Sequence, residues 1–207
     1  AALFQCIPGG SAYGIQVSGA DGLFLRLTVR VDAAAHGIIG GKGLRGGHAV
    51  VRHHHREPAV RHRGQRLEQV ARQSDVTIVR KTKPVVVEGV PRLIDELIYN
   101  LASNAIRYNQ PGGTVTLRCG TNDEGHPYLT VADTGIGIAP EEQGKVFERF
   151  YRVDKSRSKA RGGTGLGLAI VKHAAVYHHA SLDLSSELGV GTTITVTFPV
   201  QQDESFA

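Results

Sequence analysis

Residues 91–109 restrict the fold most, because they combine a helical apolar face with polar side chains inside it. Proline stands at the first turn, and Asn-Gln-Pro-Gly-Gly follows the last turn. At about 100° per residue, six apolar side chains fill a sector of roughly 140°. These are Leu93, Ile94, Leu97, Ile98, Leu101 and Ala105. A face this wide predicts a helix that lies on a sheet.

Short alternating segments around this helix supply the strands of that sheet. We expect strands at 75–80, 84–88, 114–120, 127–133, 181–187 and 192–199, with helices at 140–143 and 166–179. Thr-Asn-Asp-Glu-Gly joins the third and fourth strands as a hairpin. The predicted fold class is α/β (α+β), a two-layer sandwich with a mixed, mostly antiparallel sheet covered by helices on one face.

Charge and composition divide the 207 residues into two regions. Residues 1–66 carry a net charge of +6 and the remainder carries −1, so the basic character belongs to the first third alone. We therefore expect an unassigned Gly/Arg/His-rich segment at 1–65, in which 23–31 alternate like a strand, a folded domain at 66–202 and a tail at 203–207. Two cysteines exclude a disulfide scaffold or a zinc site, and no stretch is long and apolar enough for a membrane span.

Asn104 projects into the apolar sector of the helix at 91–109, with Asn100 and Arg107 along its edge. An amide among leucines needs a partner, because leaving it unsatisfied costs about 1–3 kcal/mol. One alternative is a hydrogen bond to a neighbouring carbonyl group. The other is a cation site, in which the Asn100 and Asn104 amide oxygens face Mg²⁺ and Arg107 meets phosphate oxygens.

Asp133 ends an apolar row that Leu129 and Val131 begin on one face of the strand at 127–133. Thr-Gly-Ile-Gly-Ile follows, and its glycines allow a flat ligand to approach the backbone closely. The carboxylate either caps this turn or accepts a hydrogen bond from the exocyclic amine of a purine.

The segment "GGTGLGLAIVKH" at 162–173 places four glycines immediately before a helix. Unpaired N–H groups and a partial positive charge at a helix start predict a bound phosphate or other anion, and the alternative is an ordinary flexible turn. The spacing matches neither a Walker loop nor the dinucleotide fingerprint.

Five segments in chain order resemble the catalytic ATP-binding domain of bacterial sensor histidine kinases, most closely the phosphate-response type. They are "NLASNAIRY" (100–108), "DTGIGI" (133–138), "VFERFYRVDKSRS" (146–158), "GGTGLGLAIVKH" (162–173) and "GVGTTITVTFP" (189–199). The resemblance covers about residues 68–200 and implies the Bergerat (GHKL) fold, which type II topoisomerases, Hsp90 chaperones and mismatch-repair ATPases share.

This resemblance implies a role for each matching residue. Asn100, Asn104 and Arg107 would be catalytic, with both asparagines as Mg²⁺ ligands, and Tyr108 would pack on adenine. Asp133 would accept the adenine amine beside the turn of Gly135, Gly137 and Ile138. Phe147 and Phe150 would anchor the lid, whose basic loop at 152–161 would close over the triphosphate. Arg149, Arg152 and Lys155 would contact phosphate. The backbone of Gly163, Thr164, Gly165, Leu166, Gly167 and Leu168 would hold the triphosphate.

Two departures from the family pattern concern the chemistry. Arg107 stands where many relatives have lysine. Asn100 stands where topoisomerases and chaperones place a glutamate that activates water, so this chain is expected to favour transfer of the γ-phosphoryl to a histidine over hydrolysis. A nucleotide-binding module without kinase activity and a hydrolytic ATPase of the same fold are the alternatives.

The resemblance also implies partners. They are ATP, a response regulator, a phosphoacceptor histidine hairpin and a second copy of the chain in the intact protein. The catalytic portion is expected in the cytoplasm, in a protein anchored in the inner membrane. Nucleic acid is not expected, because few aromatic residues interleave the arginines of residues 1–65; a basic arm binding nucleic acid or an acidic membrane remains the rival reading.

The His-Glu-x-x-x-Pro helix of the acceptor hairpin is absent from residues 1–64, where "HHHREP" (53–58) lacks the spacing. At least nine glycines before residue 47 also oppose helices, at about 1 kcal/mol each. The abrupt change near residue 66 predicts an out-of-frame or decayed copy of the hairpin. Translation of the coding DNA in its other two frames should reveal a His-Glu-x-x-x-Pro helix, and its absence from both frames would refute the hypothesis.

Overall fold

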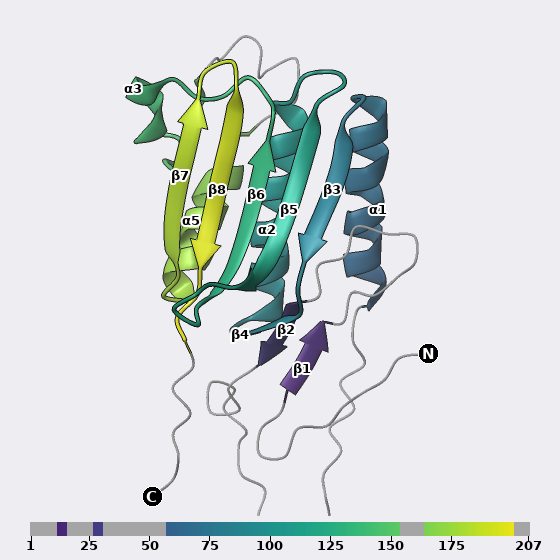
Figure 1. The fold of residues 1–207 in the computed structure, drawn as a ribbon, viewed down its shortest axis with the longest axis vertical. Coiled ribbons are helices and arrows are strands. Elements are labelled where there is room, and N and C mark those ends of the chain that lie inside the picture. Colours follow the sequence, from purple (N-terminus) through teal and green to yellow (C-terminus); the bar gives the residue numbers. More distant parts are fainter. Residues whose placement is uncertain (1–11, 16–26, 31–56, 154–163, 201–207) are drawn as a thin grey trace, which may run out of the picture.

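The computed structural model describes residues 12–15, 27–30, 57–153 and 164–200, and a five-stranded sheet forms its centre (Figure 1). The strands of this sheet are β3 (Thr77–Thr82), β5 (Thr114–Thr121), β6 (Pro127–Asp133), β7 (Ser181–Glu187) and β8 (Gly191–Thr197). Their order is β3-β5-β6-β8-β7, with β3 and β5 parallel and the other neighbours antiparallel. The predicted mixed, mostly antiparallel sheet is confirmed.

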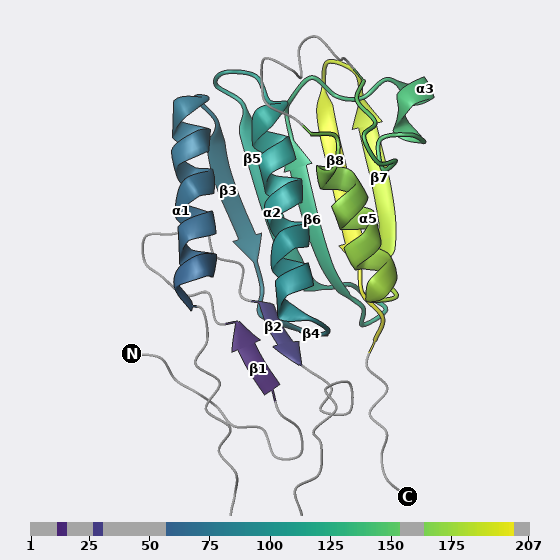
Figure 2. The same ribbon diagram turned by 180° about the vertical axis from the view of Figure 1, so that it is seen from behind.

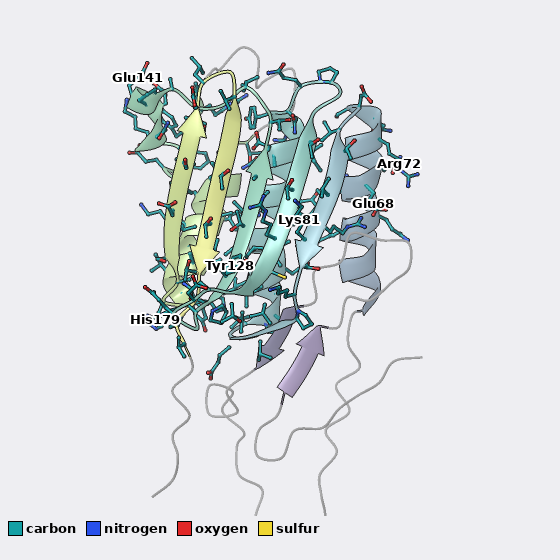
Figure 3. The ribbon with its side chains drawn as sticks, in the orientation of Figure 1. Glu68, Arg72, Lys81, Tyr128, Glu141 and His179 are labelled. Carbon is teal, nitrogen blue, oxygen red and sulfur yellow. The ribbon has the colours of Figure 1, made fainter. Side chains whose placement is uncertain are left out.

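Three helices cover one face of this sheet (Figures 1 and 2). They are α1 (Glu57–Gln73), α2 (Pro91–Arg107) and α5 (Gly167–Tyr177), whereas the short α3 (Pro140–Gln143) lies beyond the edge strand β7. The opposite face carries polar side chains such as Lys81 and Tyr128 (Figure 3). The two-layer sandwich covered on one face is therefore also confirmed.

The core lies between α2, α5 and the sheet, and the strand register builds it. Leu117 of β5 pairs with Val131 of β6, which pairs with Ile194 of β8, so one row of apolar side chains crosses three strands. The next row contains Cys119, Leu129 and Val196. Successive side chains in a strand alternate between the faces, so both rows point towards the helices. On α2, the apolar sector buries Ile94, Leu97, Leu101 and Ala105, as predicted.

Helix α1 was not predicted, and it crosses the boundary at residues 65 and 66 that composition suggested. From Arg63 onward, where burial is described, it buries a narrow stripe formed by Gly64, Leu67 and Ala71, which is too small for a clear helical period. Ion pairs hold it from both sides. Arg63 lies 2.9 Å from Asp95 on α2, and Arg80 on β3 lies 2.6 Å from Glu68.

Strand β4 (Val85–Glu88) does not pair with β3, although only two residues separate them. The chain leaves the main sheet at Lys83, whose N–H donates to the carbonyl of Cys119 at 2.9 Å, and Pro84 has no N–H to continue the ladder. Strand β4 instead joins a small sheet with β1 (Ala12–Ile15) and β2 (Leu27–Arg30). The alternation in residues 23–31 thus corresponds in part to β2.

In the part of the chain described above, no helix is long and apolar enough to cross a membrane.

Truncation of Leu97 to alanine tests the helix-on-sheet core. Leu97 is fully buried, so we expect the free energy of unfolding to fall by about 2–5 kcal/mol through lost burial and a residual cavity. Val70 on α1 is 40% exposed, and V70A should change stability by less than about 0.5 kcal/mol. Urea titration of both variants measures the difference, and equal effects would contradict this assignment of the core.

Candidate functional site

The C-terminal half of α2 meets the N-terminus of α5 at Gly167. A Cβ atom at Gly167 would lie 3.2 Å from Asn100 Oδ1 and 3.4 Å from Asn104 Nδ2, closer than ordinary side-chain contacts. Glycine at this position therefore lets the start of α5 lie against both amides. Two segments more than sixty residues apart in the sequence, each predicted to be functional, thus form one site.

The two asparagines differ in their hydrogen bonds. Asn100 Nδ2 donates to the Glu96 carbonyl at 2.7 Å, which fixes the amide and directs its Oδ1 to the α5 side. Hydrogen bonding to a neighbouring carbonyl, the alternative considered for Asn104, thus occurs at Asn100. The Asn104 amide is half-buried and lies next to Gly167 of α5. Within the described residues, no group hydrogen-bonds this amide.

Helix α5 begins without a side-chain cap. Leu166 is its N-cap residue and has no side-chain oxygen to accept from the first-turn N–H groups. Gly165, just before it, has φ +70° and a carbonyl that accepts the Phe150 N–H at 2.9 Å. No described side chain caps the first-turn N–H groups, and together with the helix dipole they suit an anion at the end of the helix that faces Asn100 and Asn104.

Asp133 forms the turn that follows β6. Its Oδ1 accepts the Gly135 N–H at 2.9 Å, so the turn-capping alternative is observed. An ionised carboxylate has two oxygens and several lone pairs, so capping leaves room for a second donor. Burial raises the pKa of Asp133 above its ordinary value, and backbone hydrogen bonds from Gly135 and Thr192 offset part of this rise.

The Asp133 turn is attached to the end of α2. The Tyr108 carbonyl accepts the Ile136 N–H at 3.1 Å, and Tyr108 is the C-cap residue of α2. A Cβ atom at Gly135 would lie 2.3 Å from that carbonyl oxygen, so only glycine fits. Gly137 has φ +66° and a similar restriction against the Glu187 carbonyl. The glycines predicted to allow close approach therefore allow the turn itself to pack.

Ser186 and Gln143 support this turn, and neither was predicted from the sequence. Ser186 Oγ accepts the Ile138 N–H at 2.8 Å and donates to the Gly191 carbonyl at 2.9 Å. Gln143 Nε2 lies 2.9 Å from the carbonyls of both Ile138 and Ser186. A signal existed for Ser186, because it continues the inward row of Leu182 and Leu184 as a polar residue, as Asp133 does in β6.

Asn109 was missed as well. It is only 6% exposed, directly after α2, and its Nδ2 donates to the Thr114 carbonyl at 3.1 Å while its Oδ1 accepts the Gln110 N–H. This amide joins the end of α2 to the start of β5, so its role in the site is to hold the backbone.

The remaining predicted residues occupy varied positions. Phe147 is partly buried and packs against the core as an anchor would, whereas Phe150 is 71% exposed and contacts Gly165 through its backbone. Arg107 is half-buried in the last turn of α2. Arg152 is half-buried, Arg149 and Thr164 are exposed, and Leu168 packs on the core. Lys155 and Gly163 lie outside the described residues, as does most of the predicted lid.

Replacing Ser186 with alanine removes the hydroxyl between the turn and the β7–β8 connection. The Ile138 N–H loses its acceptor, so we expect stability to fall by about 1–3 kcal/mol. The neighbouring Ser185 is exposed, and S185A should change stability by less than about 0.5 kcal/mol. Chemical denaturation gives both values. A loss in S186A no larger than in S185A would show that the hydroxyl network does not hold the turn.

Comparison with known proteins places this geometry in a family. Sensor-like histidine kinase SenX3 of Mycolicibacterium smegmatis is 50% identical over 115 residues, which are 56% of this chain and 30% of that protein. Sensor histidine kinase RppB of Synechocystis sp. is 49% identical over 104 residues, covering 50% of this chain and 23% of RppB. The chain thus spans less than a third of the length of either relative.

Solved structures agree in fold. The mycobacterial sensor histidine kinase MprB matches with a TM-score of 0.56 and 33% identity, covering 65% of this chain and 91% of that one. Full-length ShkA, solved in complex with AMPPNP, matches with a TM-score of 0.57 and 26% identity over 69% of this chain and 29% of ShkA. The family model for histidine kinase-, DNA gyrase B- and HSP90-like ATPases matches residues 89–202, so this chain belongs to that family.

Proposed function

We propose that this chain binds Mg-ATP at the contact between α2 and α5 and supplies the γ-phosphoryl group to a histidine of a sensor kinase hairpin. The observation that carries the proposal is the approach of Gly167 to Asn100 and Asn104, which brings an uncapped helix N-terminus against two amides. The Asp133 turn is joined to the same end of α2 through Tyr108, so purine and phosphate ligands have adjacent binding groups.

Different residues bind different parts of the nucleotide. Asp133 accepts the purine amine, Tyr108 packs on the ring, and the first-turn N–H groups of α5 bind phosphate oxygens. The amide oxygens of Asn100 and Asn104 fit Mg²⁺, a hard cation that prefers oxygen ligands, and the bond from Asn100 Nδ2 to Glu96 leaves Oδ1 for that role. Bound there, Mg²⁺ would neutralise charge on the triphosphate.

Transfer to a histidine is favoured over hydrolysis because no carboxylate occupies the position of a general base. Glu96, one turn before Asn100, lies 3.3 Å from Arg92 and 4.0 Å from Arg63, on the side of α2 that faces α1. In phosphoryl transfer the protein contributes mainly by positioning the reacting groups and stabilising their charge, and little by covalent chemistry. The acceptor hairpin, a response regulator and a second copy of the chain are the partners we propose, with the domain working in the cytoplasm.

Calorimetric titration with Mg-ATP tests the nucleotide site. We expect saturable binding that D133N weakens by about 1.5–3 kcal/mol, because an amide nitrogen replaces an oxygen that accepts from the purine. Asp183 is an exposed carboxylate on β7, so D183N is the matched control and should bind as the wild type does. If the wild type shows no binding, or if D133N and D183N behave alike, the proposed site is wrong.

A radiolabel assay then separates the alternatives. With the acceptor hairpin of a relative supplied, a kinase domain transfers label to histidine, whereas a binding module without activity leaves the hairpin unlabelled. A hydrolytic ATPase would instead release phosphate steadily, in a manner that survives N100A and is lost in E96A.

A further inference from the structure

His178 lies at the C-terminal end of α5, where its ring is 6% exposed and bonded through both nitrogens. Nδ1 lies 2.7 Å from the Ala174 carbonyl oxygen, and Nε2 accepts the Val90 N–H at 2.9 Å. A carbonyl only accepts and a backbone N–H only donates, so these partners require a neutral ring with its proton on Nδ1. The histidine therefore joins α5 to Val90, the N-cap residue of α2.

The ring also fills a space that only a glycine leaves open. A Cβ atom at Gly89 would lie 2.2 Å from His178 Cδ2, so the imidazole rests directly on the backbone before α2. Phe198, after β8, meets the ring edge to face with centroids 6.3 Å apart. His178 is thus fixed by hydrogen bonds, by a backbone surface and by an aromatic neighbour from three different segments.

Helices α2 and α5 run antiparallel and are joined at both ends (Figure 2). At one end, Gly167 of α5 lies against Asn100 and Asn104; at the other, His178 holds Val90. The eleven residues of α5 span about 16 Å, so the histidine lies far from the nucleotide groups. Figure 3 shows the adjacent His179 at the end of the sandwich opposite Glu141 of α3.

We propose that neutral His178 is a positioning residue that sets α5 against α2, and that protonation of its ring releases this contact and weakens nucleotide binding at the far end. A second ring proton would put two donors, Nε2–H and the Val90 N–H, against each other. The α5 N-terminus and the Asn100 and Asn104 amides form one site only while the helices keep their relative placement, so this inference rests on the proposed function.

Among the described residues, no carboxylate hydrogen-bonds the His178 ring, whose polar partners are the Ala174 carbonyl and the Val90 N–H. Burial lowers the pKa of His178, the Ala174 carbonyl opposes this, and nearby His179 lowers it further. Glu88 and Arg92, both exposed, flank the Gly89–Val90 segment, and His126 Nδ1 lies 3.1 Å from the carbonyl oxygen of Phe198. Because the folded pKa is below the unfolded value of 6.5, stability should fall as the pH drops through that value and level off below the folded pKa.

The full chain with H178Q and H179Q tests the proposal. A glutamine oxygen can accept the Val90 N–H but cannot titrate, and H179Q makes the same change at an exposed neighbour. Between about pH 7.5 and the lowest pH at which all three proteins stay folded, we expect the Kd for Mg-ATP to rise about threefold more in wild type and H179Q than in H178Q. The protonation of ATP affects the Kd of all three proteins equally, so it cancels in this comparison. Urea unfolding at the same pH values measures the stability of each protein.

If the Kd for Mg-ATP changes with pH in the same way in all three proteins, protonation of His178 does not weaken nucleotide binding, and the proposal is wrong. Nitrogen-15 spectra of the His178 ring identify the tautomer independently. A proton on Nε2 at neutral pH would show that this nitrogen does not accept the Val90 N–H, and the proposed contact between α5 and α2 would be wrong. If no protein binds Mg-ATP at neutral pH, the proposed function and the coupling both fail, while the spectra and the unfolding profiles still decide whether His178 joins the helices.

A double-mutant cycle with Gly89 isolates the contact. G89A alone should lower the melting temperature sharply, because its methyl group overlaps the ring. In an H178A background the same substitution should lower it much less, because the ring is gone. Equal effects of G89A in both backgrounds would show that the ring does not pack on this backbone.

Discussion

Helix α2 must cover the sheet with its apolar side chains and present two amides to α5, and the rest of the structure depends on this arrangement. Its apolar sector covers the sheet through Leu97 and Leu101, while Asn104 inside that sector and Asn100 on its edge meet α5. Because the amides adjoin the core stripe, any rotation of α2 that hid them would also expose leucine. Core packing therefore fixes the orientation of the groups we assign to the nucleotide, and a separate scaffold for the site is unnecessary.

At three places in the domain, a glycine lets two segments of the chain approach each other closely. Gly167 lies against two amides, Gly135 against the Tyr108 carbonyl, and Gly89 against the ring of His178. A β-carbon at Gly135 or Gly89 would overlap its neighbour and force two segments apart, and at Gly167 it would make a contact tighter than most side chains allow. The domain thus joins its elements through backbone contacts, which are short and stiff, and this suits a site that must hold charged groups at fixed separations.

Strong periodicity made much of this fold predictable from sequence. The strands at 127–133 and 181–187 and the helix at 140–143 have the expected bounds, and the polar interruptions at Asn104 and Asp133 led to the candidate site. Helix α1 escaped prediction because Gly64, Leu67 and Ala71 form too narrow a stripe, and ion pairs with distant residues hold it. Ser186, Gln143 and His178 were missed because their partners are backbone groups that only the tertiary structure brings near.

The order of strands in the sheet has a consequence for synthesis. Strand β6 pairs with β5, its immediate predecessor, but its other neighbour is β8, the last strand described. Until β8 leaves the ribosome, one edge of β6 keeps its N–H and C=O groups open beside buried residues such as Leu129 and Val131. A chain that stops after α5 would carry a nearly complete helical layer on a sheet with an exposed apolar edge. Strands β7 and β8 therefore complete the sheet last, and β8 pairs the edge of β6 that would otherwise stay open to another chain.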